Sequence, residues 1–94
     1  MVEELFRHKQ EQDDTIIDIR IFRVPPSATQ VEGVSYSLVY VVKGIRVVGY
    51  DNFEGHRRHG STHHRHIDGK IIPYTFVDYW QLIEDFMNDV DQWK

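Results

Sequence analysis

The chain has 94 residues and a mass of 11.2 kDa, which leaves room for a single hydrophobic core, so we expect residues 1–94 to form one domain. Hydrophobic residues make up 40% and charged residues 28%, and no apolar run approaches the roughly 20 residues that cross a bilayer, so a disordered or membrane-spanning chain is excluded. The absence of cysteine excludes disulfides and thiol catalysis, and the net charge of -4 argues against a general binder of polyanions. With no leader-like segment, we expect a cytoplasmic protein.

The first elements along the chain are read from alternation. Residues 15–24 alternate between apolar and polar side chains, which predicts a half-buried strand that ends at Pro25-Pro26. Residues 1–14 fit either a short helix or a strand that pairs with residues 15–24. The apolar face of the predicted strand carries Ile17, Ile19 and Ile21.

The next two β-rich runs, residues 34–42 and 45–50, are separated by Lys43-Gly44, which predicts a two-residue hairpin. This loop would place Val42 opposite Ile45, Tyr40 opposite Val47 and Leu38 opposite Gly49. The predicted core face carries Val34, Tyr36, Leu38, Tyr40, Val42, Ile45 and Val47. The other face is mixed and could serve as a second interface; it carries Ser35, Ser37, Val39, Val41, Arg46, Val48 and Tyr50.

A second hairpin and a helix complete the chain. Asp68-Gly69 lies between two short β-rich runs and is a strong hairpin signal. Residues 76–93 follow a helical period, with Thr75 as the expected N-cap. The apolar stripe carries Tyr79, Leu82, Ile83, Phe86, Val90 and Trp93. The solvated side is expected to carry Asp78, Glu84, Asp85, Asp89 and Asp91.

These elements together predict an α+β domain, an antiparallel sheet of about five strands with the C-terminal helix packed on one face. Because one helix covers only one face of a sheet, the partly apolar second face is available to a partner. We therefore expect a homodimer or a complex with another protein.

Histidine is the unusual feature of the composition, because five of the six histidines lie between His56 and His66. Residues 53–70 also carry a net positive charge on an otherwise acidic chain. Side chains two apart on a strand share a face, so His64 and His66 should point together, away from Arg65. The Asp68-Gly69 hairpin would place Ile72 opposite Arg65 and Ile71 opposite His66. Since Ile67 and Tyr74 share the face of Arg65, we expect His64 and His66 on the more exposed face.

Several segments carry a resemblance to a known family. They are Tyr50-Asp51-Asn52 at a strand end, Gly55-His56, the histidine-rich strand, Pro73-Tyr74-x-Phe76, and Leu82-Ile83-x-Asp85-Phe86 in the helix. Their spacing resembles the TumE-type family of small prokaryotic proteins, over about residues 16–90. The resemblance implies a toxin component of a toxin–antitoxin pair, with a cognate antitoxin as its partner, commonly encoded beside it as a helix-turn-helix protein.

One hypothesis for the histidine cluster is a metal-independent ribonuclease without a cofactor. His64 and His66 would act as general acid and base near neutral pH, and Asp51 would orient an imidazole. RNA suits this set because it supplies its own 2′-hydroxyl nucleophile. The proposed phosphate contacts are Arg57, Arg58 and Arg65, and the supporting residues are Tyr50, Asn52, His56, His59 and His63.

Two other hypotheses use the same residues. His64 and His66 could chelate Zn²⁺ or Ni²⁺, with His56, His59 or Asp51 completing the shell, although the spacing matches no defined zinc motif. Alternatively, the histidines hold only loop hydrogen bonds or a dimer contact, and the protein is a non-catalytic interaction module.

Overall fold

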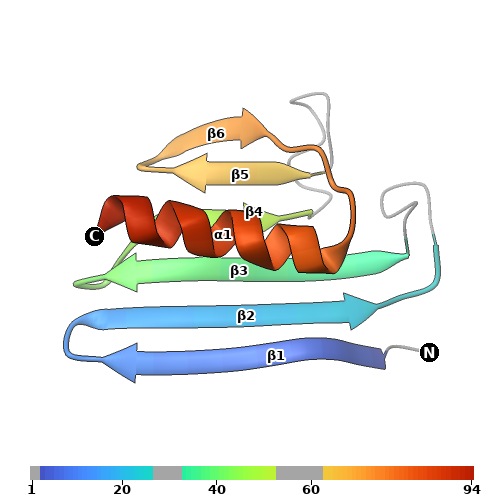
Figure 1. The fold of residues 1–94 in the computed structure, drawn as a ribbon, viewed down its shortest axis with the longest axis horizontal. Helices are drawn as coiled ribbons and strands as arrows, with labels where there is room; N and C mark the ends of the chain where they lie inside the picture. Colours follow the sequence, from blue (N-terminus) through green and yellow to red (C-terminus); the bar gives the residue numbers. More distant parts are fainter. Residues whose placement is uncertain (1–2, 27–32, 53–62) are drawn as a thin grey trace.

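The computed structural model describes residues 3–26, 33–52 and 63–94, which form one antiparallel sheet and one helix (Figure 1). The spatial order of the strands follows their order in the chain, so each pairs only with its sequence neighbours. The predicted α+β class is confirmed, with six strands in these residues rather than about five. The elements are β1 (Glu3–Gln12), β2 (Thr15–Arg23), β3 (Val34–Val42), β4 (Ile45–Asp51), β5 (His64–Ile67), β6 (Lys70–Pro73) and α1 (Tyr79–Trp93).

The N-terminal segment is a strand, which settles the alternative left by its sequence. β1 pairs with β2 from Glu3 opposite Arg23 to Gln12 opposite Thr15. Asp13 adopts a φ of 53° in the two-residue turn, a left-handed conformation that Asp tolerates. β1 thus forms one edge of the sheet, and most of its side chains are exposed.

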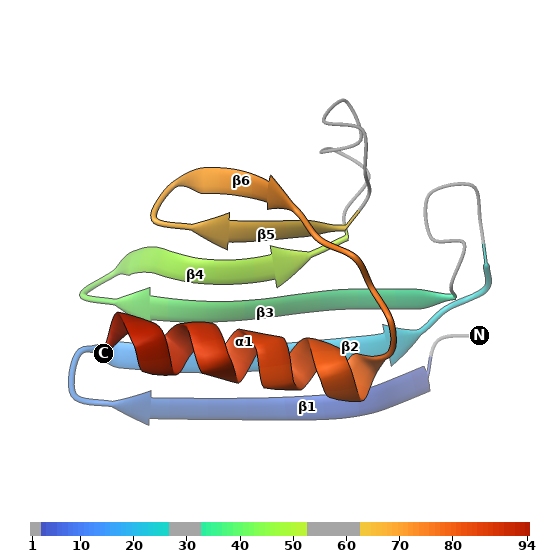
Figure 2. The ribbon, with the colours of Figure 1, turned by 45° about the horizontal axis from the view of Figure 1, so that its top comes forward.

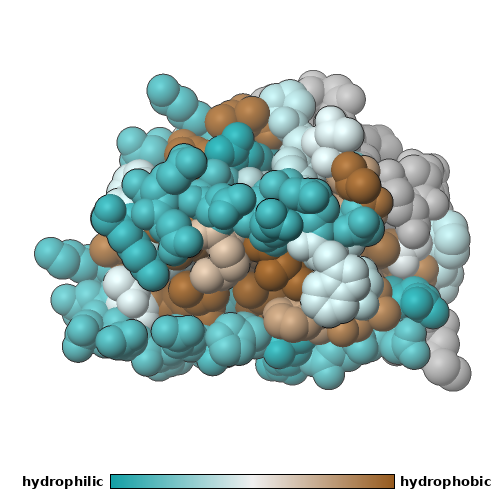
Figure 3. Space-filling model, viewed as in Figure 1, coloured by the Kyte–Doolittle hydropathy of each residue, from teal (hydrophilic) through white to brown (hydrophobic). Residues whose placement is uncertain are grey.

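The helix α1 lies along one face of the sheet, over its middle strands (Figures 1 and 2). Leu82, Phe86 and Val90 from its apolar stripe are fully buried, and burial of each such side chain contributes about 1.5–3 kcal/mol. The outer surface of the helix is hydrophilic, whereas apolar side chains line the space between the helix and the β1 edge (Figure 3). The sheet contributes Ile17, Ile19, Ile21, Tyr36, Leu38, Tyr40, Val47, Val48 and Tyr50 to this core.

The β3–β4 hairpin differs from its predicted register. Val42 lies opposite Ile45 as expected. A bulge between Tyr40 and Val41 then shifts the register, so that Tyr40 lies opposite Val48 and Leu38 lies opposite Tyr50. A bulge inserts one extra residue into one strand and reverses which face the later side chains occupy. Tyr50 and Val48 therefore point toward the core, and the prediction that they share the mixed face is wrong.

The bulge also brings Gly49 under the Arg46 side chain. Gly49 lies on the face away from the helix, where a Cβ atom would come 3.1 Å from Cδ of Arg46. The exchange of faces thus sends two large side chains into the core and leaves room for the Arg46 side chain over the glycine.

The helix begins later than its sequence period predicts. It starts at Tyr79, and Asp78 is the N-cap, with its Oδ1 accepting from the backbone N–H of Gln81 at 2.8 Å. Thr75 lies outside the helix, and the partly buried Phe76 that follows it packs against the core and stacks on Tyr36. The expectations of a helix from residue 76 and of a Thr75 cap are both wrong.

The two candidate caps make separate predictions. The D78A variant should lower the free energy of unfolding by about 1 kcal/mol, because an orphan N–H of the first turn loses its acceptor. Urea denaturation monitored by circular dichroism measures this change. The T75A variant is the matched control and should unfold at the wild-type urea concentration; a larger loss in T75A than in D78A would contradict the observed cap.

Candidate functional site

Asp51, His64 and His66 meet on the sheet face opposite α1, which we call the far face. The register of β4 and β5 pairs Asp51 with His64 and Gly49 with His66. Because strand side chains alternate, His64 and His66 share the far face with Asp51. Three of the predicted site residues are thus brought together by one antiparallel pair of strands.

The Asp51 carboxylate lies close to both imidazoles. Oδ2 of Asp51 lies 3.1 Å from Nε2 of His66, and Oδ1 lies 3.9 Å from Nδ1 of His64. The two rings are 6.3 Å apart between centroids and tilted by 41°. A carboxylate at this distance can orient the His66 ring.

The far-face histidines are more buried than predicted. His64 has no exposed surface, His66 is 5% exposed and Asp51 is also 5% exposed. The expectation that these histidines occupy the more exposed face is therefore wrong. Polar side chains are buried where other polar groups meet them, and Asp51 provides such a group for both rings.

Asn52 fixes the strand end that carries Asp51. Its side-chain Oδ1 accepts from the backbone N–H of Tyr36 at 3.0 Å, and its Nδ2 donates to the carbonyl of Val34 at 2.6 Å. The side chain thereby adds two hydrogen bonds to β3 just beyond the last residue of β4. Asn52 is fully buried and acts as a positioning residue for Asp51.

Arg65 lies on the opposite side of the sheet from the two histidines. It donates to both carboxylate oxygens of Asp89 in α1, at 2.8 Å from Nε and 2.7 Å from Nη2. The hydroxyl of Tyr50 also donates to Asp89, at 2.5 Å. The hydrogen bond to Asp89 raises the pKa of Arg65. The structure therefore ties this predicted phosphate contact to the helix and separates it from His64 and His66.

The acidic helix face is only partly solvated. Asp89 is buried and accepts hydrogen bonds from Tyr50 and Arg65. Asp85 accepts a hydrogen bond from the Tyr74 hydroxyl at 2.5 Å. The prediction that both residues lie on the solvated side of the helix is wrong for Asp89. Asp85 is half-buried, so the prediction holds only in part for that residue. A buried carboxylate needs charged or hydroxyl partners, and the sheet supplies them.

His63 belongs to the core side as well. Its Nδ1 lies 2.8 Å from the Tyr36 hydroxyl, and its ring stacks on Phe76 at 5.2 Å between centroids. His63 therefore joins the aromatic packing that leads into α1. Of the predicted supporting residues, His63 and Tyr50 lie on the helix side of the sheet, and His56 and His59 lie outside the described residues, as do Arg57 and Arg58.

The metal hypothesis depends partly on those same residues. Across residues 3–26, 33–52 and 63–94, no group of three or more His, Asp or Glu side chains is arranged to hold a metal ion.

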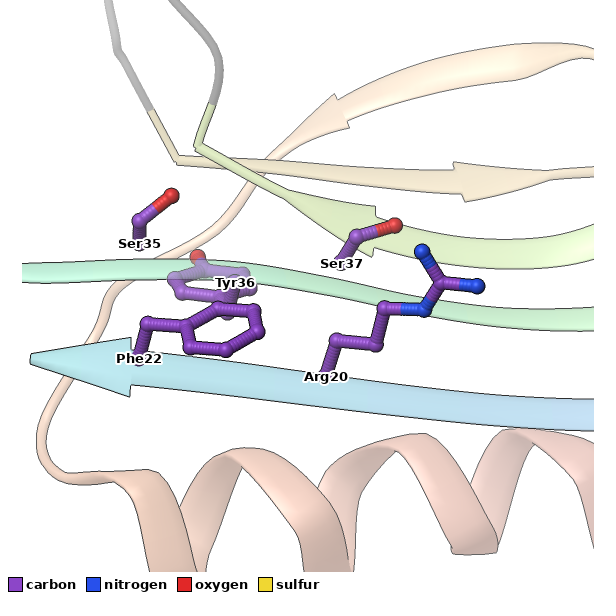
Figure 4. Close-up of a pocket in the computed structure, with 5 residues that line it drawn as sticks. All are labelled: Arg20, Phe22, Ser35, Tyr36 and Ser37. Carbon is purple, nitrogen blue, oxygen red and sulfur yellow. The ribbon is translucent and has the colours of Figure 1, made fainter. Parts of the chain in front are cut away.

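A row of polar residues extends the site across the far face. Register pairs Arg7 with Arg20, Arg20 with Ser37, Ser37 with Asp51, and Asp51 with His64. Sequence reasoning missed the first three members because the register of β2 with β3 is not set by a short turn: residues 24–33 separate the two strands in the chain. The signal was present in the alternation of polar side chains within these strands. A cavity of about 230 Å³ opens beside this row, lined by Arg20, Phe22, Ser35, Tyr36 and Ser37 (Figure 4).

The fold and the site together define a small α+β protein whose helix covers one sheet face and whose other face carries a His–Asp cluster beside a row of polar residues. The family model of Toxin TumE matches residues 2–94, so the chain belongs to the TumE toxin family. This membership confirms the resemblance in the sequence and makes the chain a toxin of a toxin–antitoxin system, with an antitoxin as its partner.

Comparison with curated proteins and with solved structures returned no match. In the part of the chain that the structure describes, no helix combines the length and apolar character needed to cross a membrane.

The Tyr50–Asp89 contact makes a prediction about pH. Burial, and then the hydrogen bond to Asp89, raises the pKa of Tyr50 well above its ordinary value. The unfolded chain releases the Tyr50 proton near pH 10 and the folded chain keeps it, so the free energy of unfolding should fall as pH rises above about 10.

Urea denaturation at a series of pH values from about 7 to about 11 measures this fall in the free energy of unfolding. The Y50F variant should show a shallower decline, and so should D89N, because it removes the carboxylate that holds the Tyr50 proton. A residual decline is expected from Tyr74, whose pKa is raised by burial and by Asp85. Identical pH slopes for wild type and Y50F would contradict the assignment.

Proposed function

We propose that this toxin is a metal-independent ribonuclease whose reacting groups lie on the far face. His64 and His66 are the acid–base pair, and Asp51 orients His66. The observation that carries the proposal is the Asp51 carboxylate at 3.1 Å from one imidazole and 3.9 Å from the other. General acid–base catalysis needs two proton-transfer groups held on one side of a substrate, and imidazole transfers protons near neutral pH.

The proposed reaction is transesterification within the RNA strand. One imidazole removes the proton of a 2′-hydroxyl, and the 2′-oxygen forms a bond to the adjacent phosphorus. The bond from phosphorus to the 5′-oxygen breaks, and the second imidazole, as imidazolium, donates its proton to that leaving oxygen. The products are a 2′,3′-cyclic phosphate and a free 5′-hydroxyl, and no metal or other co-reactant is consumed.

The proposed cations for the phosphate are one arginine of the far face and two arginines that lie outside the described residues. Arg20 lies two strands from Asp51 in the same row, separated from it by Ser37. Arg57 and Arg58 remain proposed phosphate contacts. Arg65 is assigned instead to positioning, since its bond to Asp89 holds β5 against α1.

The proposal predicts cleavage of a labelled single-stranded RNA by the purified toxin in the presence of EDTA. The H64A and H66A variants should each lower the cleavage rate by roughly 10²–10⁴-fold, since each removes one proton-transfer group. H8A is the matched control, because His8 is exposed on β1 and far along the chain from the cluster. Growth arrest on expression should follow the same order.

The substrate provides a second control. A DNA oligonucleotide with one ribonucleotide should be cut only after that ribonucleotide, and its all-DNA counterpart should remain intact, because the nucleophile is the 2′-hydroxyl. Cleavage of both, or activity abolished by EDTA and restored by Zn²⁺ or Ni²⁺, would contradict the mechanism. Equal growth arrest by wild type and the H64A/H66A double variant would contradict the catalytic assignment.

The proposal also covers the cellular location of the toxin and its oligomeric state. The toxin acts in the cytoplasm, where its RNA substrate is found, and it forms a homodimer when the antitoxin is absent. Light scattering of the purified chain measures the oligomeric state directly.

A further inference from the structure

The far face holds an aromatic side chain that the hydrophobic core does not use. Phe22 is half-buried on β2, and it lies between Glu4 of β1 and Ser35 of β3 in the register of the sheet. It is not among the side chains that form the core or pack against it. An aromatic ring among polar neighbours, on the face opposite the helix, does not serve the packing of α1.

This ring forms one wall of the cavity beside the polar row (Figure 4). Arg20 follows the same face of β2, and Ser35 and Ser37 contribute hydroxyl groups from β3. The cavity of about 230 Å³ is smaller than the roughly 300–1,000 Å³ of pockets that enclose whole drug-sized ligands. Its size and lining suit one planar, polar-edged ring system rather than a complete nucleotide.

The chemistry of the lining matches a nucleobase. The face of a phenylalanine ring stacks on any base, and serine hydroxyls both donate and accept hydrogen bonds at base edges. The Arg20 guanidinium bonds to Asp18 at 3.1 and 3.2 Å, and its side chain is about half exposed. A surface ion pair of this kind is weak, so the guanidinium can exchange Asp18 for an RNA phosphate at little cost in free energy.

The cavity is also correctly placed for a substrate of the far face. Ser37 lines the cavity and pairs directly with Asp51, which pairs with His64. Neighbouring strands are about 4.8 Å apart, so Ser37 and His64 are separated by roughly 10 Å across the sheet. An RNA strand that crosses the β-strands can place one base on Phe22 and a neighbouring phosphodiester over β4 and β5, the strands that carry Asp51 and His66.

We propose that the cavity between Phe22 and Arg20 is a base-binding subsite that holds one unpaired nucleobase of a single-stranded RNA. The inference rests on the proposed ribonuclease function and names the substrate as single-stranded, because a stacked base must be free of a complementary strand.

Binding is tested apart from cleavage with a labelled 2′-O-methyl oligonucleotide, which has no free 2′-hydroxyl and cannot be cut. Fluorescence anisotropy should give a dissociation constant roughly tenfold higher for F22L than for wild type, since leucine retains apolar volume but cannot stack. F22Y keeps the ring and should bind as wild type does. Thermal unfolding of both variants shows whether the fold is retained.

The two arginines of β2 supply a matched test of the electrostatic contribution. Arg20 and Arg23 each pair with an acidic side chain at the surface, Asp18 and Glu3 respectively. They lie on opposite faces of β2, because they are three residues apart. R20A should weaken oligonucleotide binding several-fold, whereas R23A, with the same change in net charge, should leave it unchanged.

The outcomes separate this inference from the proposed function. RNA cleavage by wild type with equal oligonucleotide binding by F22L, F22Y and wild type would overturn the subsite and leave the ribonuclease in place. Binding that depends on Phe22 and Arg20, with no cleavage of any RNA, would support the subsite and overturn the ribonuclease. If F22L weakens binding of the cognate antitoxin but not of the oligonucleotide, the cavity is a protein-docking site and the inference is wrong.

Discussion

The bulge after Tyr40 is the constraint on which the rest of the molecule depends. It sends Tyr50 toward α1 and Asp51 toward the far face. Without that extra residue, the alternation of β4 would turn the carboxylate toward the helix and the tyrosine toward the far face. An acid in the apolar core would cost several kcal/mol, so core packing and the position of the site are settled by the same backbone irregularity.

Two consecutive residues therefore serve two different purposes. Tyr50 joins Arg65 on Asp89, which fastens the helix to β4 and β5 through side chains that are largely shielded from water. Asp51 faces the histidines on the other side of the same strands. Because β4 is held on its helix side by this network and at its end by Asn52, the Asp51 carboxylate is presented by rigid backbone rather than by a loop.

Local patterns account for most of what the sequence could predict. The alternation of residues 15–24 and the two-residue loop at Lys43-Gly44 are local. The grouping of Asp51 with His64 and His66 was predicted from their residue types, but the register that pairs Asp51 with His64 is not local, because residues 52–63 separate the two strands in the chain. The bulge was not predictable, since it depends on the simultaneous fit of β3, β4 and α1. The row from Arg20 to Asp51 was missed because it depends on the bulge in β3–β4 and on the register of β2 with β3, two strands that residues 24–33 separate in the chain. Burial of Asp89 required knowledge of which sheet side chains would face it.

The order of the elements also bears on how the protein forms. In the described residues, the six strands precede the helix and pair only with their sequence neighbours, so the sheet can assemble strand by strand as the chain emerges from the ribosome. Its apolar side, built around Leu38 and Tyr36, has no cover until Tyr79–Trp93 has been synthesised. A nascent chain paused before Tyr79 would carry a nearly complete sheet with an exposed hydrophobic face, which is the state most exposed to chaperones, proteases and self-association.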